Sequence, residues 1–140
     1  MGEIINEKMV LSKIGEIVQQ YWYEISKYFG NIILDEFVIM PDHMHGIIII
    51  DNERCRDEVT PSLLHYRQRP TLGQIVGYFK YQSTKSINEF RNTPGDSIWQ
   101  TRFHEHIIRN KQELNIKRKY IINNPINWKL DKNNPKQHKI

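Results

Sequence analysis

The feature that most constrains the fold is an apolar run that begins with two histidines. Residues 40–50 read Met-Pro-Asp-His-Met-His-Gly-Ile-Ile-Ile-Ile. A Pro-Asp turn followed by such a run predicts a strand over 43–50. Because residues i and i+2 of a strand point to the same face, His43 and His45 can bind one metal ion from a rigid strand. The segment therefore predicts a metal site as well as a strand.

Apolar periodicity and capping residues predict the other elements. They are a helix between Ser12 and Gly30, a strand over 32–40, a helix from Thr71 through Phe90, a strand over 98–108 and a helix from Asn110 to Pro125. Thr71 with Gln74 has the spacing of a capping box, and Asn110 with Glu113 marks the start of the last helix. This order predicts an α+β fold, in which helices pack on an antiparallel sheet. It is the order of a ferredoxin-like sandwich that lacks its N-terminal strand.

Length and composition limit the class of protein. A chain of 140 residues predicts one domain, here over 1–130, with a charged loop at 51–70 and a basic polar tail at 131–140. The net charge of +4 favours a polyanionic partner. Cys55 is the single cysteine, which excludes an intramolecular disulfide. No apolar run approaches the roughly 20 residues that cross a bilayer, so we expect a cytoplasmic protein without a membrane partner.

Three short motifs resemble one family of enzymes. Residues 38–45 resemble the histidine-hydrophobe-histidine (HUH) motif of the tyrosine transposases that act on single-stranded DNA. That family usually carries a later Tyr-Ile-x-x-Asn-Pro signature, and residues 120–125 read Tyr-Ile-Ile-Asn-Asn-Pro. Residues 98–100 and 105–109 also resemble it. The resemblance extends from about residue 3 to residue 130 and points to the IS200-like (Y1) transposase domain, in the branch associated with repetitive extragenic palindromes.

The resemblance implies a chemistry for these residues. Tyr120 would be the nucleophile, and attack would give a 5′-phosphotyrosine and a free 3′-hydroxyl on single-stranded or hairpin DNA. A divalent ion, Mg²⁺ or Mn²⁺, would be bound by His43, His45 and Asn124 and would act as a Lewis acid. Asn124 lies four residues after Tyr120 and so on the same helix face. Two imidazoles suit Mn²⁺ better than Mg²⁺ and also suit Zn²⁺.

A set of basic residues surrounds these motifs, and Trp99 and Phe103 are available to stack a base. The candidate DNA-binding residues are Arg102, His106, Arg109, Lys117, Arg118 and Lys119. The alternative for these charges is a solvated surface. His104 and His106 form a second His-x-His pair, for which a structural or DNA-contacting role is preferred to metal binding.

Simpler interpretations stay open for each residue. Taken alone, His43 and His45 are better explained as a chance pair on a strand. The presence of Tyr120 with Asn124 makes a metal site the preferred interpretation. Tyr120 can instead pack its ring in a core. Asn124 can instead be the last residue of a helix that ends before a proline.

The family also begins with a strand that this sequence does not show before its first helix. In the resembling fold that strand lies beside the histidine strand, so its absence would expose the edge of 43–50. We therefore expect strand pairing in a homodimer, a swapped arrangement or a truncated, inactive product. Two further alternatives are a non-catalytic hairpin DNA-binding domain and a metallohydrolase that uses both His pairs with an activated water.

Overall fold

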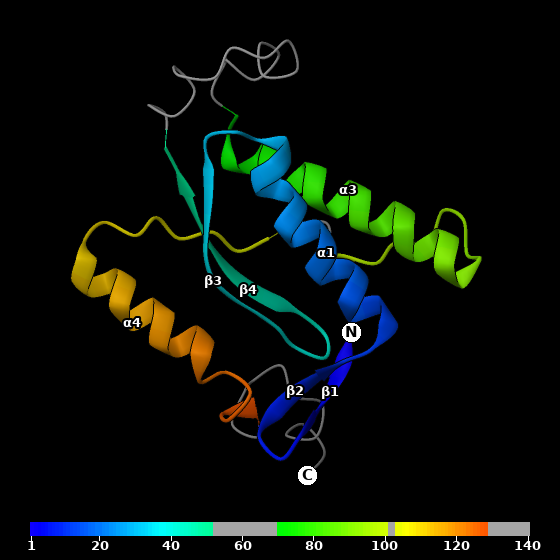
Figure 1. Ribbon diagram of the computed structural model, residues 1–140, viewed down its shortest axis with the longest axis horizontal. Helices are drawn as coiled ribbons and strands as arrows, with labels where there is room; N and C mark the ends of the chain where they lie inside the picture. Colours follow the sequence, from blue (N-terminus) through cyan, green and yellow to red (C-terminus); the bar gives the residue numbers. More distant parts are fainter. Residues whose placement is uncertain (52–69, 101–102, 129–140) are drawn as a thin grey trace. The chain divides into compact units, whose positions relative to one another are not determined.

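The computed structural model describes residues 1–51, 70–100 and 103–128 (Figure 1). Its elements are β1 (Gly2–Ile5), β2 (Lys8–Leu11), α1 (Lys13–Tyr28), β3 (Ile32–Ile39), β4 (Met44–Ile50), α3 (Leu72–Arg91) and α4 (Lys111–Ile122). The α+β class is thereby confirmed. The predicted charged loop, apart from its two end residues, and the predicted basic tail lie outside the described residues. In the described ranges, no helix combines the length and the apolar character that a membrane span requires.

Two compact units divide the chain, and each is assembled from separate segments. One comprises Met1–Glu16, Glu36–Ile47 and the described part of 104–140, and we call it the histidine unit. The other comprises Ile17–Asp35 and the described part of 48–103, and we call it the helical unit. All residues of the predicted catalytic and metal site belong to the histidine unit.

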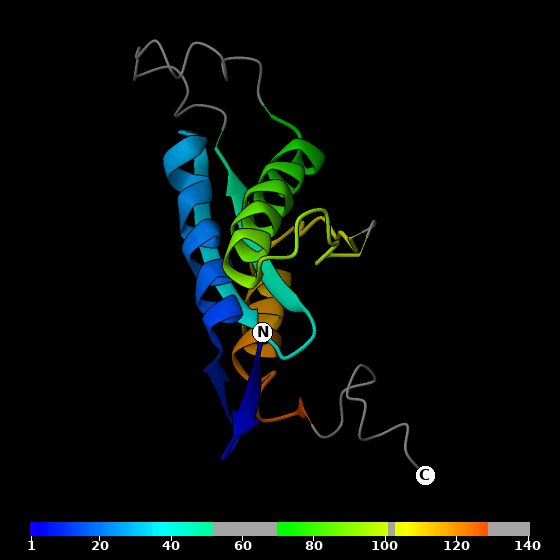
Figure 2. The same ribbon diagram turned by 90° about the vertical axis from the view of Figure 1, so that its right-hand side faces the viewer.

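Helices α1 and α3 form the core of the helical unit. The apolar stripe predicted for α1 is buried at Ile17, Val18, Trp22 and Ile25, and that of α3 at Ile75, Phe79 and Ile87. Trp22 contacts Phe79 edge to face, with ring centroids 5.9 Å apart, and the two helices lie beside one another in Figures 1 and 2. The predicted Thr71–Gln74 capping box is present at the start of α3. Local sequence signals thus gave both helices correctly.

The predicted strand over 98–108 is wrong for the residues that the structure describes there. These residues have neither strand nor helix structure. Trp99 packs against α3: its Nε1 donates to Ser83 Oγ at 2.9 Å, and its ring lies 5.5 Å from that of Phe79. Trp99 therefore contacts a helix rather than a sheet, and Ile107 of the same segment is exposed. Trp99 is also engaged in this packing rather than presented for base stacking, whereas Phe103 is exposed.

The N-terminal residues correct the expectation that no strand precedes α1. Strands β1 and β2 pair antiparallel, with Gly2 opposite Leu11 and Ile5 opposite Lys8. The turn residues Asn6 and Glu7 have φ values of 51° and 63°, the positive values that a two-residue type I′ hairpin turn requires. This hairpin forms its own sheet. Among the described residues, β4 pairs with β3 alone.

Gly15, in the opening turn of α1, allows the start of the chain to approach closely. A Cβ at Gly15 would lie 2.1 Å from the carbonyl oxygen of Met1, an atom that accepts a hydrogen bond from Ser12 N. We expect Gly15→Ala to lower the free energy of unfolding by about 1–3 kcal/mol, because backbone must move to relieve the overlap.

Gly77→Ala in α3 is the matched control in an unfolding titration. A Cβ at Gly77 meets nothing within 4 Å, so this change is expected to raise the unfolding free energy by up to about 1 kcal/mol through helix propensity. Equal effects of the two substitutions in urea would contradict the close approach at Gly15.

Candidate active site

The two histidines of the motif lie together at the turn between β3 and β4. Met40 N donates to His43 O at 2.7 Å, which closes the Pro41-Asp42 turn. The imidazole centroids of His43 and His45 are 4.9 Å apart, with the rings at 84° to one another. The Nε2 atoms of both rings are buried. The structure thus brings the predicted pair together with one nitrogen of each ring shielded from solvent.

Asp42 fixes the orientation of one of these rings. Its Oδ1 lies 2.6 Å from His43 Nδ1, so Nδ1 carries a proton and donates a hydrogen bond to the carboxylate. In that tautomer Nε2 has the lone pair and is the nitrogen able to bind a metal. Sequence reasoning treated Asp42 as a turn residue. An aspartate directly before a candidate metal-ligating histidine was the signal that could have identified it.

Tyr120 reaches the histidine pair from α4. Its ring centroid lies 5.4 Å from that of His45, at an interplanar angle of 77°. The side chain is also 54% exposed, so it contacts the imidazole while staying open to solvent. A helix residue and a strand residue far apart in sequence are therefore in direct contact, as the proposed nucleophile and metal ligand of one site would be.

The turn after α4 carries two further residues, and one of them, Trp128, contacts a histidine of the pair. Asn124, whose backbone N donates to Ile121 O at 3.2 Å, is 4% exposed and so lies buried just beyond the helix end. Trp128 stacks near His43, with centroids 6.0 Å apart and planes at 30°. The sequence motifs gave Trp128 no role. A lone tryptophan in a basic segment gave no periodic signal.

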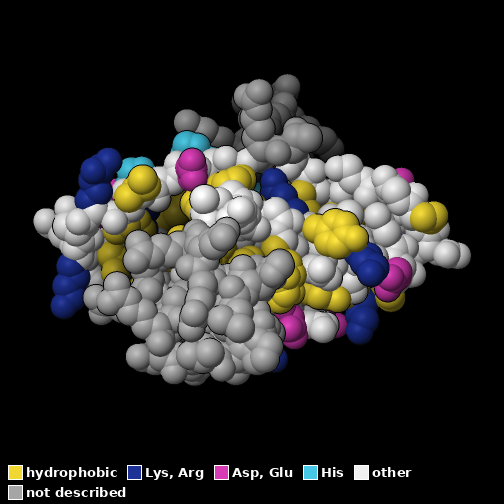
Figure 3. Space-filling view, turned by 90° about the horizontal axis from the view of Figure 1, so that it is seen from above, with side chains coloured by type: hydrophobic (Ala, Val, Ile, Leu, Met, Phe, Trp, Pro, Cys, Tyr) yellow, Lys and Arg dark blue, Asp and Glu magenta, His cyan; other side chains and the backbone are white. Residues whose placement is uncertain are grey.

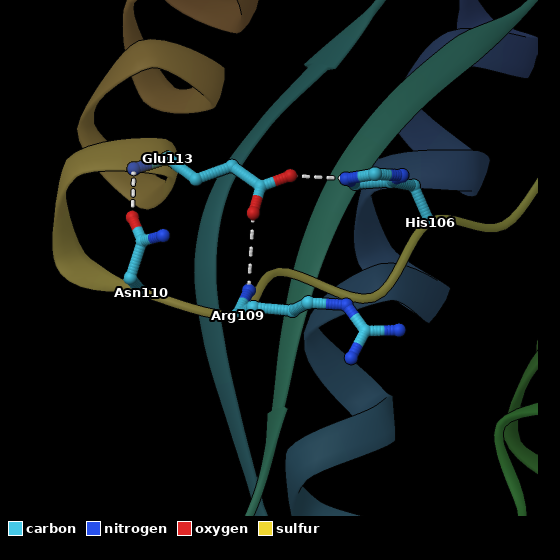
Figure 4. A network of polar contacts seen from close by, with 4 residues as sticks. All are labelled: His106, Arg109, Asn110 and Glu113. Atoms are coloured by element: carbon cyan, nitrogen blue, oxygen red, sulfur yellow. Dashed lines mark hydrogen bonds and ion pairs between the residues drawn. The ribbon is translucent and has the colours of Figure 1, made fainter.

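Polar contacts join the segment before α4 to its opening turn (Figure 4). Nε2 of His106 contacts the Glu113 carboxylate, and Arg109 N donates to Glu113 Oε2 at 3.1 Å. Glu113 N in turn donates to Asn110 Oδ1 at 2.7 Å, which confirms the predicted N-cap. The hydrogen bond from His106, followed by that from Arg109, lowers the pKa of Glu113. The stabilising effect of this carboxylate is therefore complete above its ordinary pKa of 4.5 and is lost as the pH falls through the lowered value.

Five of the six predicted DNA-binding residues lie in the part of the chain that the structure describes, on α4 or in the segment that leads into it. Arg102 lies outside the described residues. Lys117, Arg118 and Lys119 are consecutive on α4 and so point in directions about 100° apart. Arg118 Nη1 donates to Asn115 Oδ1 at 3.5 Å, and the Arg109 guanidinium points away from Glu113 (Figure 4). On the face shown in Figure 3, Lys and Arg side chains are spread singly among other types.

A metal at this site would need more than acidic and imidazole ligands. In the part of the chain that the structure describes, no three His, Cys, Asp or Glu side chains come together as a metal-binding group. Two imidazoles with an amide or a phosphate oxygen as a further ligand form a donor set that suits Mn²⁺. The buried Nε2 atoms and the Asp42–His43 contact fit such an ion.

Comparison with known proteins places the chain in a family. A protein of Haemophilus influenzae, described as an uncharacterized protein, is 39% identical over 137 residues, which cover 93% of this chain and 74% of that protein. The chain belongs to the same family as that protein. No protein-family model matches the sequence, and no solved structure matches it.

Proposed function

We propose that the protein is a metal-dependent enzyme that nicks and rejoins single-stranded or hairpin DNA, in the manner of the IS200-like tyrosine transposases, and acts in the cytoplasm. One observation carries this proposal: the Tyr120 ring contacts His45, which lies against His43. The histidine-hydrophobe-histidine motif and the Tyr-Ile-x-x-Asn-Pro motif are therefore in contact. A chance pair of histidines and a tyrosine that only fills a core would not be expected to contact one another.

The reaction is a transesterification at phosphorus. The Tyr120 hydroxyl oxygen attacks the scissile phosphate, the bond from phosphorus to the 3′ oxygen breaks, and the phenolic proton is lost. The departing 3′ oxygen takes up a proton and becomes a hydroxyl. Because one phosphoester replaces another, the 5′-phosphotyrosine keeps the energy of the bond, and a 3′-hydroxyl can later reverse the step without a cofactor.

Residues around the tyrosine prepare this step. His43, His45 and Asn124 would hold Mg²⁺ or Mn²⁺, and the ion when bound supplies Lewis-acid polarisation of the phosphate. Asp42 holds the His43 ring in the tautomer described above, and Trp128 covers that ring. Solvent exposure of the Tyr120 ring leaves room for a DNA strand to approach. Arg109 and Lys119 are exposed and Lys117 is half-buried, and these three would contact its phosphates.

The experiment that tests the function is incubation of the full chain with a labelled single-stranded hairpin oligonucleotide and Mn²⁺, with and without EDTA, followed by a denaturing gel. We expect a covalent protein–DNA band that requires the metal. Cleavage without such a band would support the metallohydrolase instead. Binding without cleavage would support the hairpin-binding domain, and either result would overturn the proposal.

Asp42 offers a separate test of the metal site. Asp42→Ala removes the acceptor of the His43 Nδ1 proton, and we expect it to weaken Mn²⁺ binding by about 10- to 100-fold, the usual cost of losing such an outer partner. Asp42→Asn keeps an acceptor oxygen and should lose much less. Calorimetric titration with Mn²⁺ compares the two. Identical affinities of all three proteins would show that Asp42 does not orient a metal ligand.

A further inference from the structure

Apolar burial holds α4 at one end. Of its 12 residues, Ile121 is the buried one, and it directly follows Tyr120. Ile116 and Ile122 are exposed. Leu114, nearer the start of α4, is only half-buried, so the start of the helix is less firmly packed than its end and can tilt. The direction of α4 therefore depends on what holds its other end.

The contacts of Glu113 hold that other end. The carboxylate binds the His106 ring and the backbone N–H of Arg109, both in the segment that leads into the helix. Glu113 precedes Tyr120 by seven residues, which is two helical turns, so the two side chains lie on nearly the same face and about 10 Å apart along the axis. One face of α4 thus carries two attachments: Glu113 to His106 and Tyr120 to His45.

We propose that His106 and Glu113 are positioning residues, which hold the start of α4 so that Tyr120 stays against His45. This inference rests on the function proposed above, in which Tyr120 is the nucleophile. His106 thereby acquires a role different from the DNA contact expected from sequence. The groups that face the Glu113 carboxylate are His106, the Arg109 backbone and Lys117. The carboxylate is ionised at neutral pH, and the hydrogen bond from His106 lowers the pKa of Glu113 further.

The kinetic test measures the rate of adduct formation at saturating DNA. Glu113→Ala is expected to lower this rate by about 10- to 100-fold, the effect of a displacement near 1 Å at a reacting group, while the dissociation constant for DNA is unchanged. His106→Ala should do the same, and the double variant should be no slower than either single one. Glu113→Gln keeps an acceptor for Arg109 N–H and should recover part of the rate. Gln112→Ala, at an exposed neighbouring position of α4, is the control.

A second measurement separates this inference from the proposed function. In the NMR spectrum, the ring current of Tyr120 shifts the His45 ring protons, and Tyr120→Leu gives their positions without it. We expect Glu113→Ala and Glu113→Gln to move these signals toward the Tyr120→Leu positions, the former more. Unmoved signals, or additive effects of the His106 and Glu113 changes, would overturn the positioning role. Moved signals in a protein whose wild type forms no adduct would support the positioning and refute the proposed function.

Discussion

Phenylalanine in place of Tyr120 is expected to abolish the covalent protein–DNA adduct, with a loss of at least about 10³-fold, because the attacking oxygen is removed. Folding and DNA binding should be preserved. The ring that contacts His45 is kept, and the side chain is already 54% exposed, so little burial changes. The measurement is the adduct band on a denaturing gel, with circular dichroism and a binding titration on the same samples.

Tyr81 provides the matched control for this substitution. It lies on α3 in the helical unit and is 64% exposed. Tyr81→Phe should leave the rate of adduct formation unchanged. An adduct that persists in Tyr120→Phe would show that another nucleophile is used, and cleavage that persists without an adduct would point to attack by water.

Alanine in place of His43 or His45 is expected to have the next largest effect. Each change removes one of two imidazoles whose buried Nε2 atoms are the proposed metal ligands. Residues that hydrogen-bond to a metal ligand contribute roughly 10- to 100-fold to metal affinity. Loss of a ligand itself should weaken Mn²⁺ binding by at least that factor, and adduct formation should fall with it. Calorimetry for the metal and gel analysis for the adduct give both quantities.

His104 serves as the control for the histidine changes. It belongs to the second His-x-His pair and is exposed. His104→Ala should leave Mn²⁺ affinity and adduct formation unaltered. If His43→Ala and His45→Ala retain wild-type metal affinity, or if His104→Ala loses it, the metal is bound elsewhere and the assignment of the site is wrong.

Much of the fold followed from local sequence signals. Short-range capping pairs mark the starts of two helices: Thr71 with Gln74 for α3, and Asn110 with Glu113 for α4. Both helices begin where these pairs predict. The strand over 98–108 failed because alternation shows which side chains are apolar but not what they contact. Trp99 packs on α3 through Ser83 and Phe79. The β1–β2 hairpin was missed because its Asn6-Glu7 turn lacks the glycine that usually marks such turns.

The candidate site was predictable where it rests on motifs, and unpredictable where it rests on tertiary contacts. The two histidines and Tyr120 were identified from the sequence, and the structure brings them together. The contact of Trp128 with His43 joins the turn after α4 to the turn between β3 and β4, and so depends on tertiary packing. The role of Glu113 at the start of α4 also needed coordinates, because its contact with His106 joins the helix to an irregular segment before it.

The central claim is that Tyr120 becomes covalently joined to DNA, and peptide mapping by mass spectrometry tests it most directly. After reaction with hairpin DNA and Mn²⁺, nuclease and trypsin digestion should leave the peptide of residues 120–129, which follows Lys119 and ends at Lys129. The account predicts a nucleotide attached through phosphate to Tyr120. A nucleotide found on another residue, or cleaved DNA with an unmodified peptide, would contradict it.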